Sequence, residues 1–321
     1  MNIRSITFQA LLLPFFILTV LSCSKDRITP IRSDIPLSEA KDSTDEIFIA
    51  SPNKILQRFA IAPTSQTINS AQDMPFIGKK GTKIFASNHD FMFPNGDYAN
   101  FPIRLEILEL FTPKDMILHQ MPTVSNGRLL TTGGEVNVKA YKDGQELRLS
   151  PWNGMKIEIP STDVDFSMSL FYGNTASDGT VNWVEAQFRD REGQDSNFSR
   201  IIPTKENYQI FPQQIGWINC DRFSSYTGAK TRIKFSSLKP KLASIVTFLY
   251  FDGIKSVAQV YGEESLEVPV GEHVKVICVA SKANGDLYTY STNFNVHQDQ
   301  VVEVKLEQTT EADFLANLGS L

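Results

Sequence analysis

The residue best placed for chemistry is Cys23, whose thiol can carry a lipid once the segment before it has been removed. It follows the small residue Ser22 at the end of an apolar run, and Arg4 provides positive charge near the start. A positive start, a short apolar core and a small residue before the cleavage point are typical of a secretory signal peptide. Residues 1–22 are therefore predicted to be a signal peptide, and Cys23 the lipidation site.

The alternatives are a transmembrane anchor, or ordinary cleavage that leaves Cys23 free. A spanning helix needs about 20 apolar residues, whereas the run from Ile6 to Leu21 is shorter and is interrupted by Pro14. We therefore expect an outer-membrane lipoprotein that faces the periplasm or the cell surface. Its membrane contact would be the N-terminal lipid, and firm anchoring needs more than one acyl chain.

Several acidic residues could support other chemistry. Asp163 and Asp165 would share one face of a strand, where they could bind Ca²⁺ or simply form a solvated strand end. Glu106, Glu109 and Glu135 are candidates for the paired acids of glycoside hydrolysis. Alternation places Glu106 and Glu109 on opposite faces of a regular strand, so neither stands out as catalytic.

The common signatures of catalytic and metal sites are missing from the sequence. There is no HxH, HExxH, CxxC, GxSxG or P-loop pattern. We therefore predict no catalytic residue, no metal and no cofactor, and interpret the widely spaced histidines as surface or structural residues: His89, His119, His273 and His297.

Two cysteines remain beyond the signal peptide, Cys220 and Cys278. They could form a disulfide, which an exported protein permits, or stay apart as small buried apolar residues. Five aromatic residues could either stack on sugars or pack in a core, where large aromatics are favoured: Trp152, Trp183, Trp217, Tyr250 and Tyr261.

The composition bounds the partners. The chain has 321 residues and a net charge of −5, and this mild acidity argues against a nucleic-acid partner, whose phosphates require basic patches. The length suits two or more domains. A protein or a glycan remains the expected partner.

A polar, irregular stretch follows the signal peptide. Residues 23–46 contain two prolines, many charges and no periodicity, which is typical of a flexible linker. Within it, Asp42-Ser43-Thr44 resembles the O-glycosylation motif of Bacteroidota lipoproteins and makes Ser43 the candidate glycosylation site; plain linker is the alternative.

The rest of the chain shows a β pattern. Short alternating or β-branched runs recur, with turn signals between them, and Asp143-Gly144 is the sharpest hairpin signal. We predict an all-β chain with two β-sandwich domains in tandem: one over 47–212, and an immunoglobulin-like or prealbumin-like one over 213–321. Two short helices are expected, one after Thr112 and one C-terminal helix after Thr310, both with capping residues.

An ordered series of residues suggests a family. The series comprises Gly81-Thr82, Ile84, Phe91, Asn95-Gly96, Glu109, Asp115-Met116, Thr123, Asn126 to Leu130, Gly133-Gly134, Gly144, Leu147, Ile159-Pro160 and Gly216 to Phe223. It resembles a recurrent β domain of Bacteroidota lipoproteins that is similar to the ZU5 β-sandwich. The resemblance implies a fold for the first domain and no activity. The His-Phe-Ser tripeptide of self-cleaving relatives is absent, so autoproteolysis is not expected.

Together, the anchor, the spacer and the β domains favour a lipid-anchored envelope or cell-surface protein with a non-enzymatic binding or assembly role. The alternative is an envelope hydrolase acting on glycan or peptide. A tight cleft with two facing carboxylates and a strongly shifted pKa would favour that alternative, and a closed, loop-capped sandwich without such a cleft would count against it.

Overall fold

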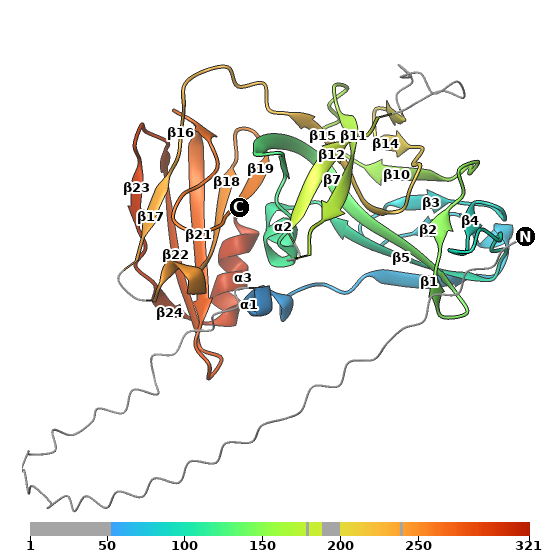
Figure 1. Ribbon diagram of the computed structural model, residues 1–321, viewed down its shortest axis with the longest axis horizontal. Coiled ribbons are helices and arrows are strands. Elements are labelled where there is room, and N and C mark those ends of the chain that lie inside the picture. Colours follow the sequence, from blue (N-terminus) through green and yellow to red (C-terminus); the bar gives the residue numbers. More distant parts are fainter. Residues whose placement is uncertain (1–52, 178–179, 188–199, 238–239) are drawn as a thin grey trace, which may run out of the picture. The chain divides into compact units, whose positions relative to one another are not determined.

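The computed structural model describes residues 53–177, 180–187, 200–237 and 240–321 (Figure 1). The predicted signal peptide and linker, with Cys23 and Ser43, lie outside the described residues. The described part of the chain is built mainly from short strands, which confirms the all-β prediction. Its helices are α1 (Asn53–Gln57), α2 (Pro113–His119) and α3 (Glu311–Gly319). Helices α2 and α3 were predicted, whereas α1 was not.

The first group of sheets, here called the first module, contains strands β1 to β15. Its larger sheet runs β1-β5-β7-β15-β11-β12, and β6 and β8 also pair with β7. The bounds in this sheet are β1 (Thr64–Ile68), β5 (Ile103–Leu110), β6 (Val124–Ser125), β7 (Arg128–Lys142), β8 (Gln145–Glu146), β11 (Ser169–Thr175), β12 (Val181–Glu185) and β15 (Gly216–Phe223).

A five-stranded sheet and a small strand pair complete the first module. The sheet runs β13-β14-β10-β3-β2, and β4 pairs with β9. The bounds are β2 (Phe76–Ile77), β3 (Lys83–Phe85), β4 (Phe91–Met92), β9 (Arg148–Leu149), β10 (Lys156–Pro160), β13 (Ile201–Pro203) and β14 (Asn207–Ile210).

The second module contains β16 to β24. Its main sheet runs β19-β18-β21-β22-β24, and two short pairs, β16 with β20 and β17 with β23, accompany it. The bounds are β16 (Lys230–Thr231), β17 (Lys234–Ser236), β18 (Val246–Phe251), β19 (Ser256–Val260), β20 (Val268–Pro269), β21 (His273–Ser281), β22 (Leu287–Asn295), β23 (Val301–Glu303) and β24 (Glu307–Thr309).

Strand β15 corrects the predicted domain boundary. The sequence-based boundary at 212/213 assigns Gly216–Phe223 to the second domain, but β15 pairs with β7 and β11 in the centre of the first module's larger sheet. Its middle residues, Ile218 to Asp221, are all buried, because a central strand is covered on both faces. The strands of the first module therefore continue to Phe223.

The alternation of buried and less buried residues along β5 breaks down near the end of the strand. Ile103, Leu105 and Ile107 are buried, and so are Glu109 and Leu110. The pairing of β5 with β7 continues without a shift, so the strand has no bulge there and its end is buried on both faces. Leu105 and Ile107 face the core of the first module, whereas Leu110 enters a second cluster.

That second cluster joins the modules, and we call it the joint core. It combines Phe171 and Trp183 of the first module with Phe248 and Val279 of the second, and all three helices contribute to it. Figure 1 shows helices α1, α2 and α3 beside the strands of both modules. Burial of each large apolar side chain stabilises the fold by about 1.5–3 kcal/mol. The two modules therefore share a hydrophobic core and are not two loosely linked domains.

Polar contacts accompany the joint core. Thr123, between α2 and β6, donates its backbone N–H to the carbonyl of Val257 in β19 at 2.8 Å. Its hydroxyl accepts from the Val257 N–H at 2.8 Å and lies 3.0 Å from the Ser256 hydroxyl. Thr123 is fully buried, so these bonds satisfy polar groups that would otherwise be costly to bury.

The C-terminal helix α3 docks on the joint core through its apolar face. Phe314 and Leu318, one turn apart, are buried in the joint core, and Leu315 is half-buried beside them. Thr310 caps the helix by accepting the Asp313 N–H at 3.1 Å, and Lys114 of α2 donates to the Leu315 carbonyl at 2.9 Å.

The substitution Phe314→Ala tests whether α3 is part of the core. We expect it to lower the free energy of unfolding by about 3–5 kcal/mol, because it removes a buried ring and leaves a cavity. Urea unfolding of the full chain measures this, with Leu315→Ala as the control that should cost clearly less. Equal losses from the two variants would contradict the docking.

Candidate functional site

An open groove lies where two sheets end. Strand β12 is an edge strand of the first module's larger sheet, and β19 is an edge strand of the second module's main sheet. Between them is a cavity of about 540 Å³, within the ~300–1,000 Å³ range of ligand pockets. The lining residues come from both modules: Pro122, Val124, Gly127, Thr180, Val181, Asn182, Arg232, Gln259, Tyr261, Glu264, Ser265 and Leu266.

Tyr261 is the aromatic residue of this groove. Its side chain is 57% exposed, and its hydroxyl donates to Gln259 Oε1 at 3.2 Å. A large exposed aromatic residue in a hollow can offer its ring to a ligand. Trp152 is also exposed, but it lies on a turn after β9 and does not line the groove.

The other candidate aromatics serve the interior. Trp183 is fully buried and donates its indole N–H to the Pro122 carbonyl at 2.9 Å. Tyr250 is buried as well. Trp217 is half-buried and packs edge-on against Trp183, with 6.4 Å between the ring centres. The sequence pattern could not separate the aromatic residue that lines the groove from the buried ones, because the two sides of the groove come from different modules.

Charged and amide groups line the same groove. Arg232 donates one guanidinium N–H to the Ser265 carbonyl at 3.1 Å, which fixes the side chain and leaves its other N–H donors for a ligand. Glu264 is exposed, and among the described residues its carboxylate has neither an ion pair nor a hydrogen bond. The groove therefore presents donors and an acceptor together.

A tight turn separates this groove from a second hollow. Asn126 and Gly127 have φ values of 47° and 75°, and the turn is held to β12 by two bonds between Asn126 and Asn182, of 2.8 and 3.1 Å. On the other side lies a hollow of about 250 Å³ that Gly127 also lines. Its lining includes Arg128, Tyr226, Lys230 and Glu267.

The acidic residue Glu135 is sealed in the interior. Glu135 and Asp221 lie on neighbouring strands β7 and β15 and are both fully buried. The Asn219 amide donates to Asp221 Oδ2 at 2.7 Å and, over a long 3.4 Å, towards Glu135 Oε1. Burial, and then the neighbouring Asp221 carboxyl, raises the pKa of Glu135 well above its usual range. Burial likewise raises the pKa of Asp221.

This carboxyl pair is a structural cluster and is not part of the groove. It sits where the β7–β15 pairing shifts between Asn219 and Asp221, and Glu135 Oε2 has no hydrogen-bond partner among the described residues. Sequence reasoning missed it, because nothing in the sequence places Asp221 beside Glu135.

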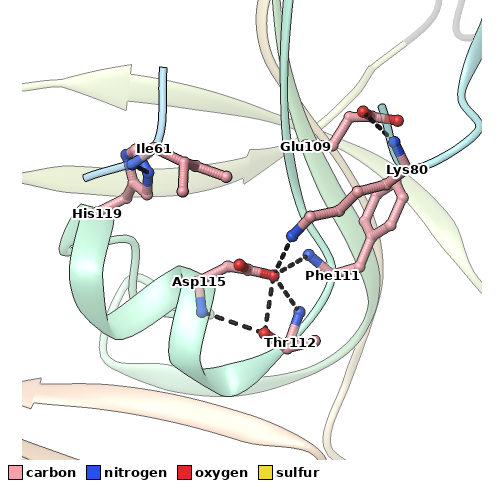
Figure 2. A network of polar contacts seen from close by, with 7 residues as sticks. All are labelled: Ile61, Lys80, Glu109, Phe111, Thr112, Asp115 and His119. Carbon is pink, nitrogen blue, oxygen red and sulfur yellow. Dashed lines mark hydrogen bonds and ion pairs between the residues drawn. The ribbon is translucent and has the colours of Figure 1, made fainter. Parts of the chain in front are cut away.

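Glu109 is a second buried acid, and its role is to hold a loop. Its two carboxylate oxygens accept the backbone N–H groups of Lys80 and Thr82 at 2.7 and 2.9 Å, and the Lys80 contact is drawn in Figure 2. A side chain at Gly78 would come within 2.5 Å of this carboxylate. Glu109 therefore fixes the β2–β3 turn onto β5. Glu106 lies on the other face and pairs with Arg104.

The start of helix α2 carries the rest of the network in Figure 2. Asp115 Oδ2 accepts from the Thr112 N–H and hydroxyl at 2.9 and 2.7 Å and pairs with Lys80 at 2.6 Å. Burial alone would raise the pKa of Asp115, but the bonds from Lys80 and Thr112 hold it below its usual value. At the other end, burial lowers the pKa of His119, whose Nε2 accepts the Ile61 N–H at 3.1 Å.

Asp163 and Asp165, the candidates for calcium binding or a solvated strand end, lie between β10 and β11, not on a shared strand face, and both pair with cations. Asp163 pairs with Lys255 at 2.6 Å and Asp165 with Arg222 at 2.6 Å. Hydrogen bonds from Ser167 and Arg222 lower the pKa of Asp165 to about 2. Within the described ranges, no group of three or more histidine, cysteine or acidic residues could hold a metal ion.

The predicted disulfide alternative is wrong. Cys220 and Cys278 are both free and buried, and they belong to different clusters, Cys220 to the core of the first module and Cys278 to that of the second. Burial raises the pKa of both thiols, that of Cys278 to about 12, so they act as small apolar residues.

Comparison with known proteins adds little. No protein-family model matches the chain, and no curated protein matches it. A solved structure, the gamma-CGTase of alkalophilic Bacillus clarkii, is 10% identical with a TM-score of 0.17 and covers 76% of this chain and 41% of its own. The chain thus spans less than half of that enzyme, and so low a score supports no inference about fold or activity. Within the described residues, none of the helices is long and apolar enough to cross a membrane.

The substitution Glu135→Gln tests the buried carboxyl pair. The raised pKa means that the folded state binds the proton of Glu135 more tightly than the unfolded state does. The free energy of unfolding therefore falls as the pH rises from the unfolded pKa, about 4.3, towards the higher pKa of the folded state. In the unmodified chain, the free energy of unfolding should fall between pH 5 and pH 8. Glu135→Gln should make this fall smaller, by about 1.4 kcal/mol for each unit by which the fold raises the pKa of Glu135.

Urea unfolding at both pH values measures this effect. Glu206→Gln, at an exposed position, is the matched control and should leave the pH dependence as in the unmodified chain. If Glu135→Gln also leaves it unchanged, the buried pair is ionised in the fold and the assignment fails.

Proposed function

We propose that the chain is a lipid-anchored envelope protein, tethered through Cys23, whose folded body has a non-enzymatic binding role. The first module would be the ZU5-like sandwich that the sequence resembles. The groove between β12 and β19 would be the binding site, and residues 23–46 would hold the body away from the membrane.

The observation that carries the binding role is the groove itself. It is open, has a volume of about 540 Å³ and is lined by both modules, and the joint core fixes its two walls. A preformed hollow with a few convergent polar groups is the usual form of a ligand site. Arg232 and Glu264 keep hydrogen-bonding capacity within it, which supports binding of a polar ligand.

The hydrolase alternative has less support. Glycoside hydrolysis needs two carboxyl groups on either side of the scissile bond. Among the described residues that line the groove, only Glu264 carries a carboxyl group, and the carboxyl pair Glu135–Asp221 is sealed from solvent. This distribution favours binding over catalysis.

The substitution Cys23→Ala tests the anchor. We expect it to move the chain from the membrane fraction to the soluble fraction, because the acyl chains supply the membrane contact. Fractionation followed by immunoblotting measures the shift. Retention of Cys23→Ala in the membrane fraction would contradict lipid anchoring at this residue.

The substitution Glu264→Trp tests the groove as a binding site. A Trp at this exposed lining position should fill the hollow and abolish saturable binding of the purified chain to delipidated envelope material, as measured by co-sedimentation. The control is Glu303→Trp, on β23 and away from the groove, which should bind like the unmodified chain. The proposal fails if the unmodified chain does not bind, or if Glu264→Trp binds equally well.

A further inference from the structure

On the basis of the proposed binding role, we infer that the groove between β12 and β19 binds a neutral glycan chain, with a sugar ring stacked on Tyr261. The inference goes beyond a general binding role because it names the chemical class of the ligand.

The exposed ring of Tyr261 matches the shape and polarity of a sugar. A pyranose has an apolar C–H face and a polar rim, so it matches an aromatic residue that is exposed on its face and polar at its end. Tyr261 is 57% exposed, and its hydroxyl is oriented by Gln259. Tyr261 is the aromatic side chain among the described residues that line this groove.

The polar groups around the ring provide the second argument. A sugar hydroxyl both donates and accepts, so it suits a site that presents donors beside an acceptor. The Arg232 guanidinium and the Gln259 amide N–H₂ are donors, and the Glu264 carboxylate is an acceptor. One positive and one negative charge in the same groove offset each other, which favours a neutral ligand over an ionic one.

The extent of the site supports a chain of sugars over a single one. The groove reaches Gly127, and the second hollow of about 250 Å³ begins at the same residue. Its lining is also mixed: Tyr226 is aromatic, Arg128 and Lys230 are cationic, and Glu267 is acidic. An extended ligand could follow this path across the junction of the two modules.

An extended peptide is the competing occupant, and the sheet edge argues against it. Strand addition needs a row of unpaired backbone groups. The start of the β19 edge is already used: Val257 exchanges bonds with Thr123, and the carbonyl of Lys255, just before the strand, accepts the Thr132 N–H at 3.4 Å. Only the end of β19 reaches the groove, so a peptide would gain a short ladder at best.

Selective destruction of the ligand tests the inference. The full chain, purified in detergent, is mixed with delipidated envelope material that has been treated with periodate, which cleaves vicinal diols of sugars, or with protease. We expect periodate to abolish binding and protease to leave it intact. Binding to the periodate-treated material, or loss of binding to the protease-treated material, would overturn the glycan assignment while leaving the binding role in place. If untreated material does not bind, the proposed function itself fails.

Variants of Tyr261 locate the contact. Tyr261→Ala should weaken binding roughly tenfold because it removes the stacking ring, whereas Tyr261→Phe keeps the ring and should stay close to the unmodified chain. Circular dichroism and thermal unfolding confirm that both variants are folded. Equal affinities for the unmodified chain and a folded Tyr261→Ala variant would overturn the role of the ring.

Discussion

The architecture depends on the burial of one long strand, β7, in three apolar clusters. Along its 15 residues, Val136, Val138 and Ala140 face the core of the first module, Leu130 enters the joint core, and Leu129 reaches the core of the second module. Interiors are close-packed and transmit displacement, because no void lets one neighbour move alone. A shift of β7 would therefore disturb both modules, and the turn at Asn126-Gly127 just before it is placed by the same packing.

The same constraint explains where polar groups can be buried. Glu135 lies on β7 and Asp221 on β15, at the point where their register shifts. A raised pKa means that the folded state favours the uncharged carboxyl, which removes most of the cost of burying a charge. Glu109 solves the problem differently, since two backbone N–H groups bond its carboxylate. The buried acids Glu135, Asp221 and Glu109 are therefore explained by local packing and hydrogen bonding, whereas Glu264 in the groove is exposed.

Local features of the fold could be predicted from the sequence, and long-range features could not. Strand β5, the turn at Asp143-Gly144 with its positive φ values, and the caps at Thr112 and Thr310 follow from periodicity and backbone preference within a few residues. The place of β15 depends on pairing with β7, about 80 residues earlier, for which periodicity contains no signal. The buried pair Glu135–Asp221 depends on that same pairing. The contrast between buried Trp183 and exposed Tyr261 likewise depends on tertiary packing, so neither feature could be predicted from local periodicity.

The groove follows from the way the joint is closed. Thr123 and Thr132 cover the first half of the β19 edge, which satisfies backbone groups that an exposed edge would offer to other chains. Beyond Val257 the covering segment turns away through Asn126 and Gly127, and Asn182 holds that turn to β12. Gln259, near the end of β19, and Tyr261, just after it, line the hollow. Since each wall belongs to a different module, neither module alone would form the site, and the packing that joins them is what keeps its shape.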